Sequence, residues 1–160
     1  MKEILMSKLF EYIRDNNPDI LFELEASQSV TVWLSDKVES ISLFIEQVIK
    51  QGLPEYEAEE ICMIELTAAL KPSKYNYLLN LLEEEFSNKY NQFLASSLLQ
   101  HEVSNMITHC KPVFDDLNFS EENEDNQFLR YAIINSVNEY LNSENETVSH
   151  ELQQPTETEG

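Results

Sequence analysis

The chain has 160 residues, a formal net charge of −20 at pH 7 and hydrophobic residues at 42% of its positions. It contains only two glycines, Gly52 and Gly160, which argues against sandwiches and barrels with their many tight turns and favours helices joined by short connections. An acidic excess this large repels phosphate backbones, so it disfavours direct binding to nucleic acid and favours basic partners.

The first third of the chain is predicted to form two helices joined by a connection. The first helix covers residues 2–16 and ends at Asn16-Asn17-Pro18. Residues 18–27 are predicted to be a connection whose apolar side chains pack against the core. The second helix covers residues 28–51, because one broad apolar stripe continues through it, and Gly52 then ends it in a left-handed conformation.

The next helix is expected to begin with Pro54 at its first position and to end before Pro72. Ser73 is a suitable N-cap for a helix over residues 73–86. We expect this helix to be the central element of the fold, since apolar side chains three and four positions apart form one stripe along it. These side chains are Tyr75, Leu78, Leu79, Leu82 and Phe86.

A further helix is predicted over residues 88–110, with Lys111-Pro112 as its stop. An acidic loop, residues 112–124, is expected to pack down on the core because it carries four large apolar side chains. The last helix is predicted near residues 124–142. The fold class is therefore all-α, a compact bundle of about five to six helices with an acidic loop before the last helix.

The predicted domain organisation is one helical domain, residues 1–142, followed by a disordered acidic tail, residues 143–160. The tail is rich in Asn, Ser, Glu, Thr and Gln and has no apolar period. The N-terminus has no cleavable apolar run, and no segment has the apolar length of a membrane span, so a cytoplasmic protein that does not bind membranes is expected.

Residues 73–75 (Ser-Lys-Tyr) and 85–86 (Glu-Phe) resemble the signature of a small all-helical, Bacteroides-type domain family of unknown function. In that family a Ser-Lys-Tyr-Asp start leads into a leucine-rich helix that ends in Asn-Glu-Phe. The resemblance covers most of residues 28–142. The resemblance implies an all-helical fold and a gene of the kind often carried near conjugative-transposon genes. It implies no particular activity.

This chain departs from that pattern at three positions. Asn76 stands where an acid is usual, Glu83 where the family tends to have Trp, and Glu84 where it has Asn. If the family shares a binding surface there, this chain has altered it. We therefore take Lys74, Asn76, Glu83 and Glu84 as a candidate interaction surface.

No motif for catalysis or cofactor binding is present, so no catalytic residue and no cofactor are predicted. Cys62 and Cys110 lie in apolar helical patterns and are expected to be small core residues. A metal ion at His101 and His109, or calcium at Asp115–Asp125, is an open alternative. We expect the two histidines to be solvated instead. The acidic loop lacks the glycine that lets a calcium-binding loop turn sharply, so we do not expect it to bind calcium.

The sequence thus favours a non-enzymatic, acidic helical module that binds an unidentified protein partner, with a link to mobile elements implied by the resemblance. One alternative is a DNA mimic that inhibits a nucleic-acid-binding protein. Another is an enzyme of unrecognised type that uses scattered Glu, His or Tyr residues. A homodimer is left open, because the apolar stripes could serve one core or two.

Overall fold

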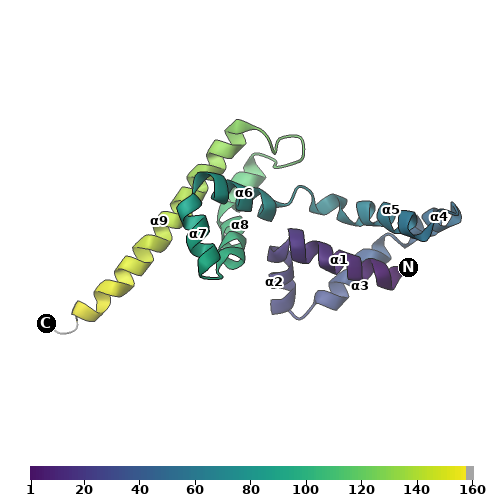
Figure 1. Cartoon of the computed structure of the whole chain (residues 1–160), viewed down its shortest axis with the longest axis horizontal. Coiled ribbons are helices and arrows are strands. Elements are labelled where there is room, and N and C mark those ends of the chain that lie inside the picture. The colour runs from purple at the N-terminus through teal and green to yellow at the C-terminus, as the bar shows by residue number, and fades with distance from the viewer. Residues whose placement is uncertain (158–160) are drawn as a thin grey trace. The chain divides into compact units, whose positions relative to one another are not determined.

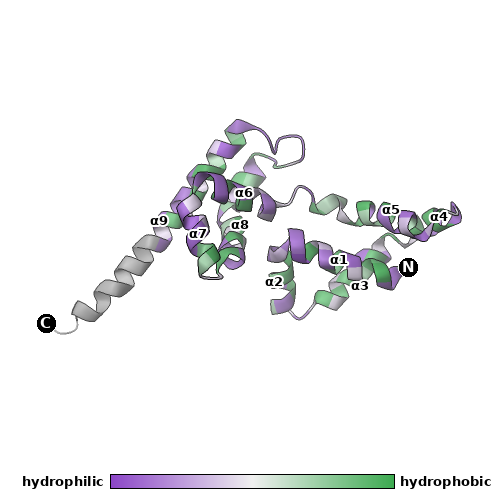
Figure 2. Cartoon of the chain, in the orientation of Figure 1, coloured by the Kyte–Doolittle hydropathy of each residue, from purple (hydrophilic) through white to green (hydrophobic). Residues whose placement is uncertain are grey.

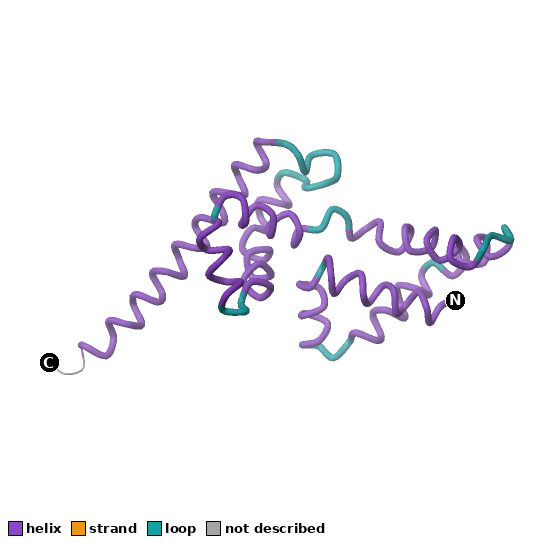
Figure 3. The backbone as a smooth tube through the Cα atoms, viewed as in Figure 1, coloured by secondary structure: helices purple, strands orange, loops and turns teal. Residues whose placement is uncertain are grey.

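The computed structural model describes the backbone of residues 1–157 and the side chains of residues 1–144. All regular elements in this part of the chain are helices, nine α-helices and one short 3-10 helix (Figure 1; Figure 3). The predicted all-α class is confirmed, and the predicted number of five to six helices is too low. The chain divides into two compact units, Met1–Tyr77 and Leu78–Gly160.

The first unit is built around its first helix. The elements are α1 (Lys2–Asn16), α2 (Pro18–Ala26), α3 (Val30–Ser40), α4 (Ser42–Lys50), α5 (Glu55–Thr67) and the 3-10 helix η1 (Ala68–Leu70). Close packing joins α1 to α2, α3 and α5, and joins α4 to α5. The core consists of buried apolar side chains from all five α-helices: Leu5, Leu9, Ile13, Leu21, Leu34, Val38, Ile45, Val48, Ala58, Cys62 and Leu66. Figure 2 shows hydrophobic and hydrophilic residues interspersed along these helices.

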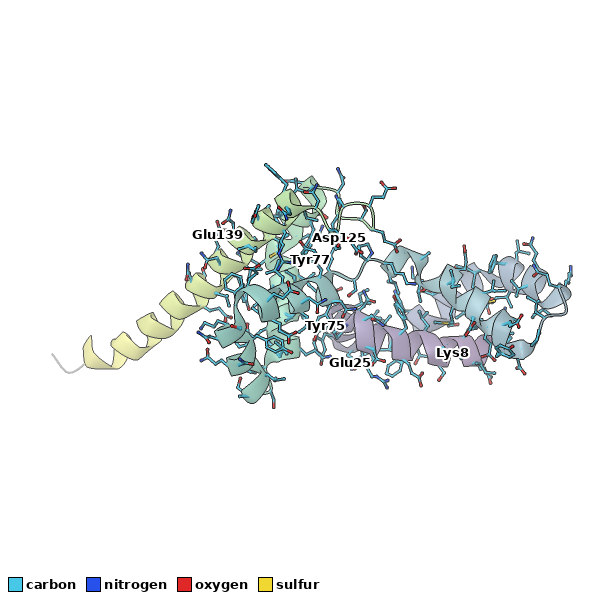
Figure 4. All side chains as sticks on the ribbon, turned by 45° about the horizontal axis from the view of Figure 1, so that its top comes forward. Lys8, Glu25, Tyr75, Tyr77, Asp125 and Glu139 are labelled. Carbon is cyan, nitrogen blue, oxygen red and sulfur yellow. The ribbon has the colours of Figure 1, made fainter. Side chains whose placement is uncertain are left out.

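One charged residue is also buried in this unit. Glu59 of α5 is 9% exposed. Its Oε2 atom lies 2.6 Å from Nζ of Lys8 on α1 (Figure 4). The ion pair compensates the burial of the carboxylate and ties α5 to α1.

Two predicted boundaries in the first unit are wrong. Residues 18–27, expected to be a connection, form α2, because Pro18 both ends α1 and occupies a favourable first position of the next helix. The helix expected over residues 28–51 is divided at Ile41, whose φ of −111° and ψ of 19° separate α3 from α4. The hydroxyl of Ser40 donates to the carbonyl of Lys37, and the amide of Ile41 bonds Val38 instead of Lys37.

The predicted end of the following helix at a left-handed glycine is confirmed, since Gly52 has a φ of 70°. Pro54 stands one residue earlier than expected, as the N-cap of α5. Both residues act where the chain reverses between α4 and α5.

The helix expected to be central is α6 (Lys74–Glu85), and the boundary between the two units falls within it, after Tyr77. Its predicted N-cap is confirmed, because the amide of Asn76 donates to Oγ of Ser73 at 3.0 Å. Leu78, Leu81 and Leu82 are fully buried. The most extensive helix packing nevertheless involves α1 in the first unit and α8 in the second. The prediction that α6 is the central helix of the fold is therefore wrong. An apolar stripe indicates burial and not the number of neighbouring helices.

The second unit continues with α7 (Ser87–Ala95), α8 (Leu99–Asp116) and α9 (Gln127–Glu157). Close packing joins α8 to α9 and α7 to α8 (Figure 1). Its buried apolar side chains come from α6 to α9 and are Leu78, Leu81, Leu82, Phe93, Val103, Met106, Cys110, Phe114, Leu129, Ile133, Val137 and Leu141.

Two predictions for α7 and α8 are also wrong. The helix expected over residues 88–110 is two helices, with Ser97 in a left-handed conformation (φ 61°) between them. The helix does not stop at Pro112 but continues to Asp116. Cys110 and Phe114 lie one turn apart on the buried side of α8, and their burial offsets the cost of an interior proline, which is about 3 kcal/mol.

The loop before the last helix covers residues 117–126 rather than 112–124. Its Phe119 ring packs against Phe114, with ring centroids 4.8 Å apart. The backbone of α9 continues past residue 142 to Glu157. Side chains from residue 145 onward lie outside the described residues, so the tail over residues 143–160 and the single domain over residues 1–142 stay predictions.

Candidate functional site

Two of the four predicted surface residues, Lys74 and Asn76, lie in the first unit and take part in its internal contacts. Nδ2 of Asn76 donates to Oδ1 of Asn16 at 3.0 Å. The hydroxyl of Ser73 donates to the backbone carbonyl of Asn16. These bonds join the end of α1 to the start of α6. The side chain of Asn76 therefore stabilises the contact between these two helices.

This joint also contains buried polar groups. Asn17 is 6% exposed, and the Oδ1 atoms of Asn17 and Asp19 have no hydrogen-bond partner among the described residues. Burial raises the pKa of the Asp19 carboxyl, and the positive charge of half-buried Lys74 opposes that shift. Lys74 therefore acts on a buried carboxyl of its own unit.

The other two predicted residues, Glu83 and Glu84, lie in the second unit and are exposed. Nη2 of Arg130 on α9 lies 2.8 Å from Oε2 of Glu84 and 3.0 Å from Oε1 of Glu85. The C-terminal end of α6 thus carries three consecutive carboxylates, and two of them, Glu84 and Glu85, pair with one guanidinium.

A group of titratable side chains in the second unit lies between α8 and α9. The hydroxyl of Tyr140 is 2.6 Å from Oε2 of Glu102 and 3.0 Å from Oε1 of Glu144. The ring of His109 lies 5.6 Å from that of Tyr140, tilted by 59°. Glu102 and His109 are two helical turns apart on α8, and Tyr140 and Glu144 are one turn apart on α9. We name Glu102, His109, Tyr140 and Glu144 the tyrosine–carboxylate cluster.

The electrostatics of this cluster raise the pKa values of Tyr140 and Glu144. Burial raises the pKa of Tyr140, and the neighbouring carboxylate of Glu102 raises it further. Burial and the charge of Glu102 also raise the pKa of Glu144, while Tyr140 and Lys89 lower it. A general base needs a pKa near the working pH, and a tyrosine whose pKa is raised moves away from that condition. The geometry suits a polar clamp between two helices.

Sequence reasoning missed Glu102 and Glu144. The available signal was spacing, Glu102 seven residues before His109 and Tyr140 four residues before Glu144, which puts each pair on one helix face. Such pairs are common on exposed helices. Only the packing of α8 against α9 makes these two pairs meet.

The predicted place of the cysteines is confirmed. Cys62 and Cys110 are free and fully buried. Burial raises the pKa of both thiols, which keeps them protonated and unreactive. His101 and His109 are exposed. Across the described residues, no three His, Cys, Asp or Glu side chains gather as a group that could hold a metal ion.

Residues 5–146 match a family described as a Domain of unknown function (DUF1896). The chain belongs to the DUF1896 family. The DUF1896 match spans parts of both units and includes the four predicted surface residues and the tyrosine–carboxylate cluster. Comparison with curated proteins and with solved structures gave no match. In the described part of this DUF1896 chain, no helix is both long enough and apolar enough to cross a bilayer.

Proposed function

We propose that the chain is a non-enzymatic, acidic helical module that binds and regulates a basic protein partner in the cytoplasm. The observation that carries the proposal is the uneven distribution of charge. Residues 78–160 hold sixteen acidic residues against three basic ones, and residues 1–77 hold fourteen against seven.

Two of the three basic residues of the second unit form ion pairs with carboxylates. Arg130 pairs with Glu84 and Glu85, and Lys111 pairs with Asp115. Carboxylates such as Glu83 remain exposed beside them. A surface of this kind attracts basic proteins and accelerates their association, and salt weakens this attraction.

The proposed interaction surface is therefore narrower than the one the sequence predicted. Glu83 and Glu84 stay in it because they are exposed, and Lys74 and Asn76 leave it because they act within the first unit. A role linked to mobile elements belongs to this proposal as well, and it rests on the resemblance to Bacteroides-type sequences near conjugative-transposon genes.

Affinity capture from native cell extract, with the full chain as bait and stepwise salt elution, tests this proposal. We expect a basic protein that is released at moderate salt. A Glu83→Gln/Glu121→Gln/Glu122→Gln variant, which removes three exposed carboxylates from the second unit, should capture less of it. A matched variant, Glu3→Gln/Glu11→Gln/Glu25→Gln, removes three exposed carboxylates from the first unit and should capture the protein normally. A partner that resists salt, or equal capture by both variants, would contradict the proposal.

The identity of the captured protein separates the two acidic-surface functions. If it binds nucleic acid and DNA displaces the chain from it, the chain acts as a DNA mimic. If DNA does not compete, the chain regulates its partner in another way. Turnover of a substrate by the chain alone would contradict the non-enzymatic assignment.

A further inference from the structure

The joint between the end of α1, the start of α2 and the start of α6 contains two buried oxygen atoms that lack a donor. Asn17 is 6% exposed, and as the N-cap of α2 it makes no capping hydrogen bond through its side chain. Its Oδ1 atom and the Oδ1 atom of Asp19 are both buried and have no hydrogen-bond partner among the described residues. Two such acceptors at the start of one helix destabilise the contact, because each has lost its hydrogen bonds to water.

The neighbouring donors at this joint are bonded to other acceptors. The hydroxyl of Ser73 donates to the backbone carbonyl of Asn16, and Nδ2 of Asn76 donates to Oδ1 of Asn16. Nδ2 of Asn16 in turn donates to the carbonyl of Tyr12. The two buried oxygens therefore need a donor that these side chains do not supply.

The chemistry of the two oxygens selects what the joint can take up. Hydrogen-bond acceptors repel an anion, although the N-terminus of a helix attracts one. In the part of the chain that the structure describes, no three His, Cys, Asp or Glu side chains gather as a group that could hold a metal ion. A proton needs no further ligand, and Asp19 is the titratable member of the pair. A proton on its carboxyl converts one of the two acceptors into a donor.

We infer that this joint is a proton-sensitive contact, which tightens when Asp19 takes up a proton from water and loosens when the proton is released. Acidification should therefore stabilise the attachment of α6 to α1 and α2, and ionised Asp19 should weaken it. This contact is a regulatory property of the first unit and does not depend on the proposed partner binding.

The charged groups around Asp19 act in opposite directions. Burial is the largest effect and raises the pKa of its carboxyl, the backbone amides at the start of α2 and the ammonium of Lys74 lower it, Glu23 raises it, and the net shift is upward. At the end of α1, Arg14 and Asp15 pair with each other at 3.1 Å, so together they add no net charge. The protonated form of Asp19 therefore stabilises the fold below the ordinary pKa of 3.8, and this contribution is lost as pH rises through the raised value. The third helix that contacts this region, α3, carries exposed charged residues, which are Asp36, Lys37 and Glu39.

Asp19→Asn in the full chain tests the inference. Asparagine has nearly the shape of aspartate, still accepts from backbone amides, supplies a donor and has no charge at any pH. Trp33 is the only tryptophan and lies in the first unit, so its fluorescence follows urea unfolding of that unit. We expect the variant to unfold at a higher urea concentration than wild type at pH 7.5, and the difference to shrink at pH 4.5. Glu25→Gln removes an exposed carboxylate from the same helix and should keep the wild-type pH dependence (Figure 4).

A second measurement uses the wild-type chain and does not depend on the stability of a variant. With the aspartate carboxyls labelled with carbon-13, the Asp19 resonance should titrate with a midpoint above the ordinary 3.8. A midpoint at or below that value would overturn the inference. So would an Asp19→Asn variant that is no more stable than wild type at pH 7.5, or one that gains equally at both pH values. None of these results affects the proposed function, because Asp19 is not part of the acidic surface of the second unit.

Discussion

Removing the hydroxyl of Tyr140 should weaken the packing of α8 against α9. In Tyr140→Phe the bonds of 2.6 Å to Glu102 and 3.0 Å to Glu144 are lost, and two half-buried carboxyl groups lose their donor. A phenol carries one proton, so only one of the two contacts is a full donation at any moment. Hydrogen bonds to charged groups contribute about 1.5–3 kcal/mol, and partial exposure reduces this to an expected loss of about 1–2 kcal/mol.

The loss should depend on pH with a definite sign. Because the pKa of Glu144 is raised in the folded chain, its protonated form stabilises the fold below the ordinary pKa of 4.5, and that contribution is lost as pH rises through the raised value. The hydroxyl of Tyr140 favours the ionised form of Glu144. Without it the pKa of Glu144 rises further, and the variant is penalised more at pH 7.5 than at pH 4.5.

Urea unfolding of the full chain, followed by circular dichroism at both pH values, measures this effect. Tyr131→Phe is the matched control, since it removes the hydroxyl of an exposed tyrosine on the same helix and should change the free energy of unfolding by less than about 0.5 kcal/mol. Equal stability of Tyr140→Phe and wild type, or a larger loss at pH 4.5, would refute the clamp.

Three further substitutions test the local structure by urea unfolding at pH 7. Ser73→Ala removes the acceptor of the Asn76 amide and should cost about 1–2 kcal/mol; no loss would mean that the cap is unimportant. Gly52→Ala meets no atom within 4 Å but must adopt a φ of 70°, so it should cost about 1 kcal/mol, and a stabilised variant would contradict the left-handed turn. Pro112→Ala restores a donor for the Thr108 carbonyl within α8 and should stabilise the second unit by about 1–2 kcal/mol, since relief of an interior proline outweighs the freedom gained by the unfolded chain. Destabilisation by Pro112→Ala would show that the helix is not continuous there.

The elements that could be predicted from the sequence are those decided by local chemistry. Pro18 ends α1, Gly52 ends α4, and the hydroxyl of Ser73 caps α6, each through one residue's own geometry. The burial of Cys62 and Cys110 follows from the period of the apolar residues around them. These features need no knowledge of distant parts of the chain.

The helix boundaries that were predicted wrongly depend on competition between local backbone preferences and the burial of side chains in the core. The apolar stripe continues across Ile41 because residues on both sides reach the same core, so the period did not mark the break that Ser40 helps to form. Conversely, Pro112 predicted a stop, and the burial of Phe114 beyond it carried the helix on.

The candidate sites also divide into features that depend on local residues and features that depend on tertiary packing. Exposure of Glu83 and Glu84 was predictable from their place after a leucine-rich stripe, whereas the internal role of Asn76 depends on the position of Asn16, sixty residues away. The tyrosine–carboxylate cluster is a consequence of which side of α9 packs on α8. No local spacing specifies that choice.

The affinity of the full chain for a synthetic peptide that places Leu and Lys on opposite faces of a helix, measured across a range of salt, tests the central claim most directly. The claim is that this acidic chain binds basic protein segments. It predicts measurable binding at about 50 mM salt that falls at least severalfold by about 200 mM, because ion pairs to an exposed acidic surface are screened. Absence of binding at the lower salt, or an affinity that does not change with salt, would contradict it.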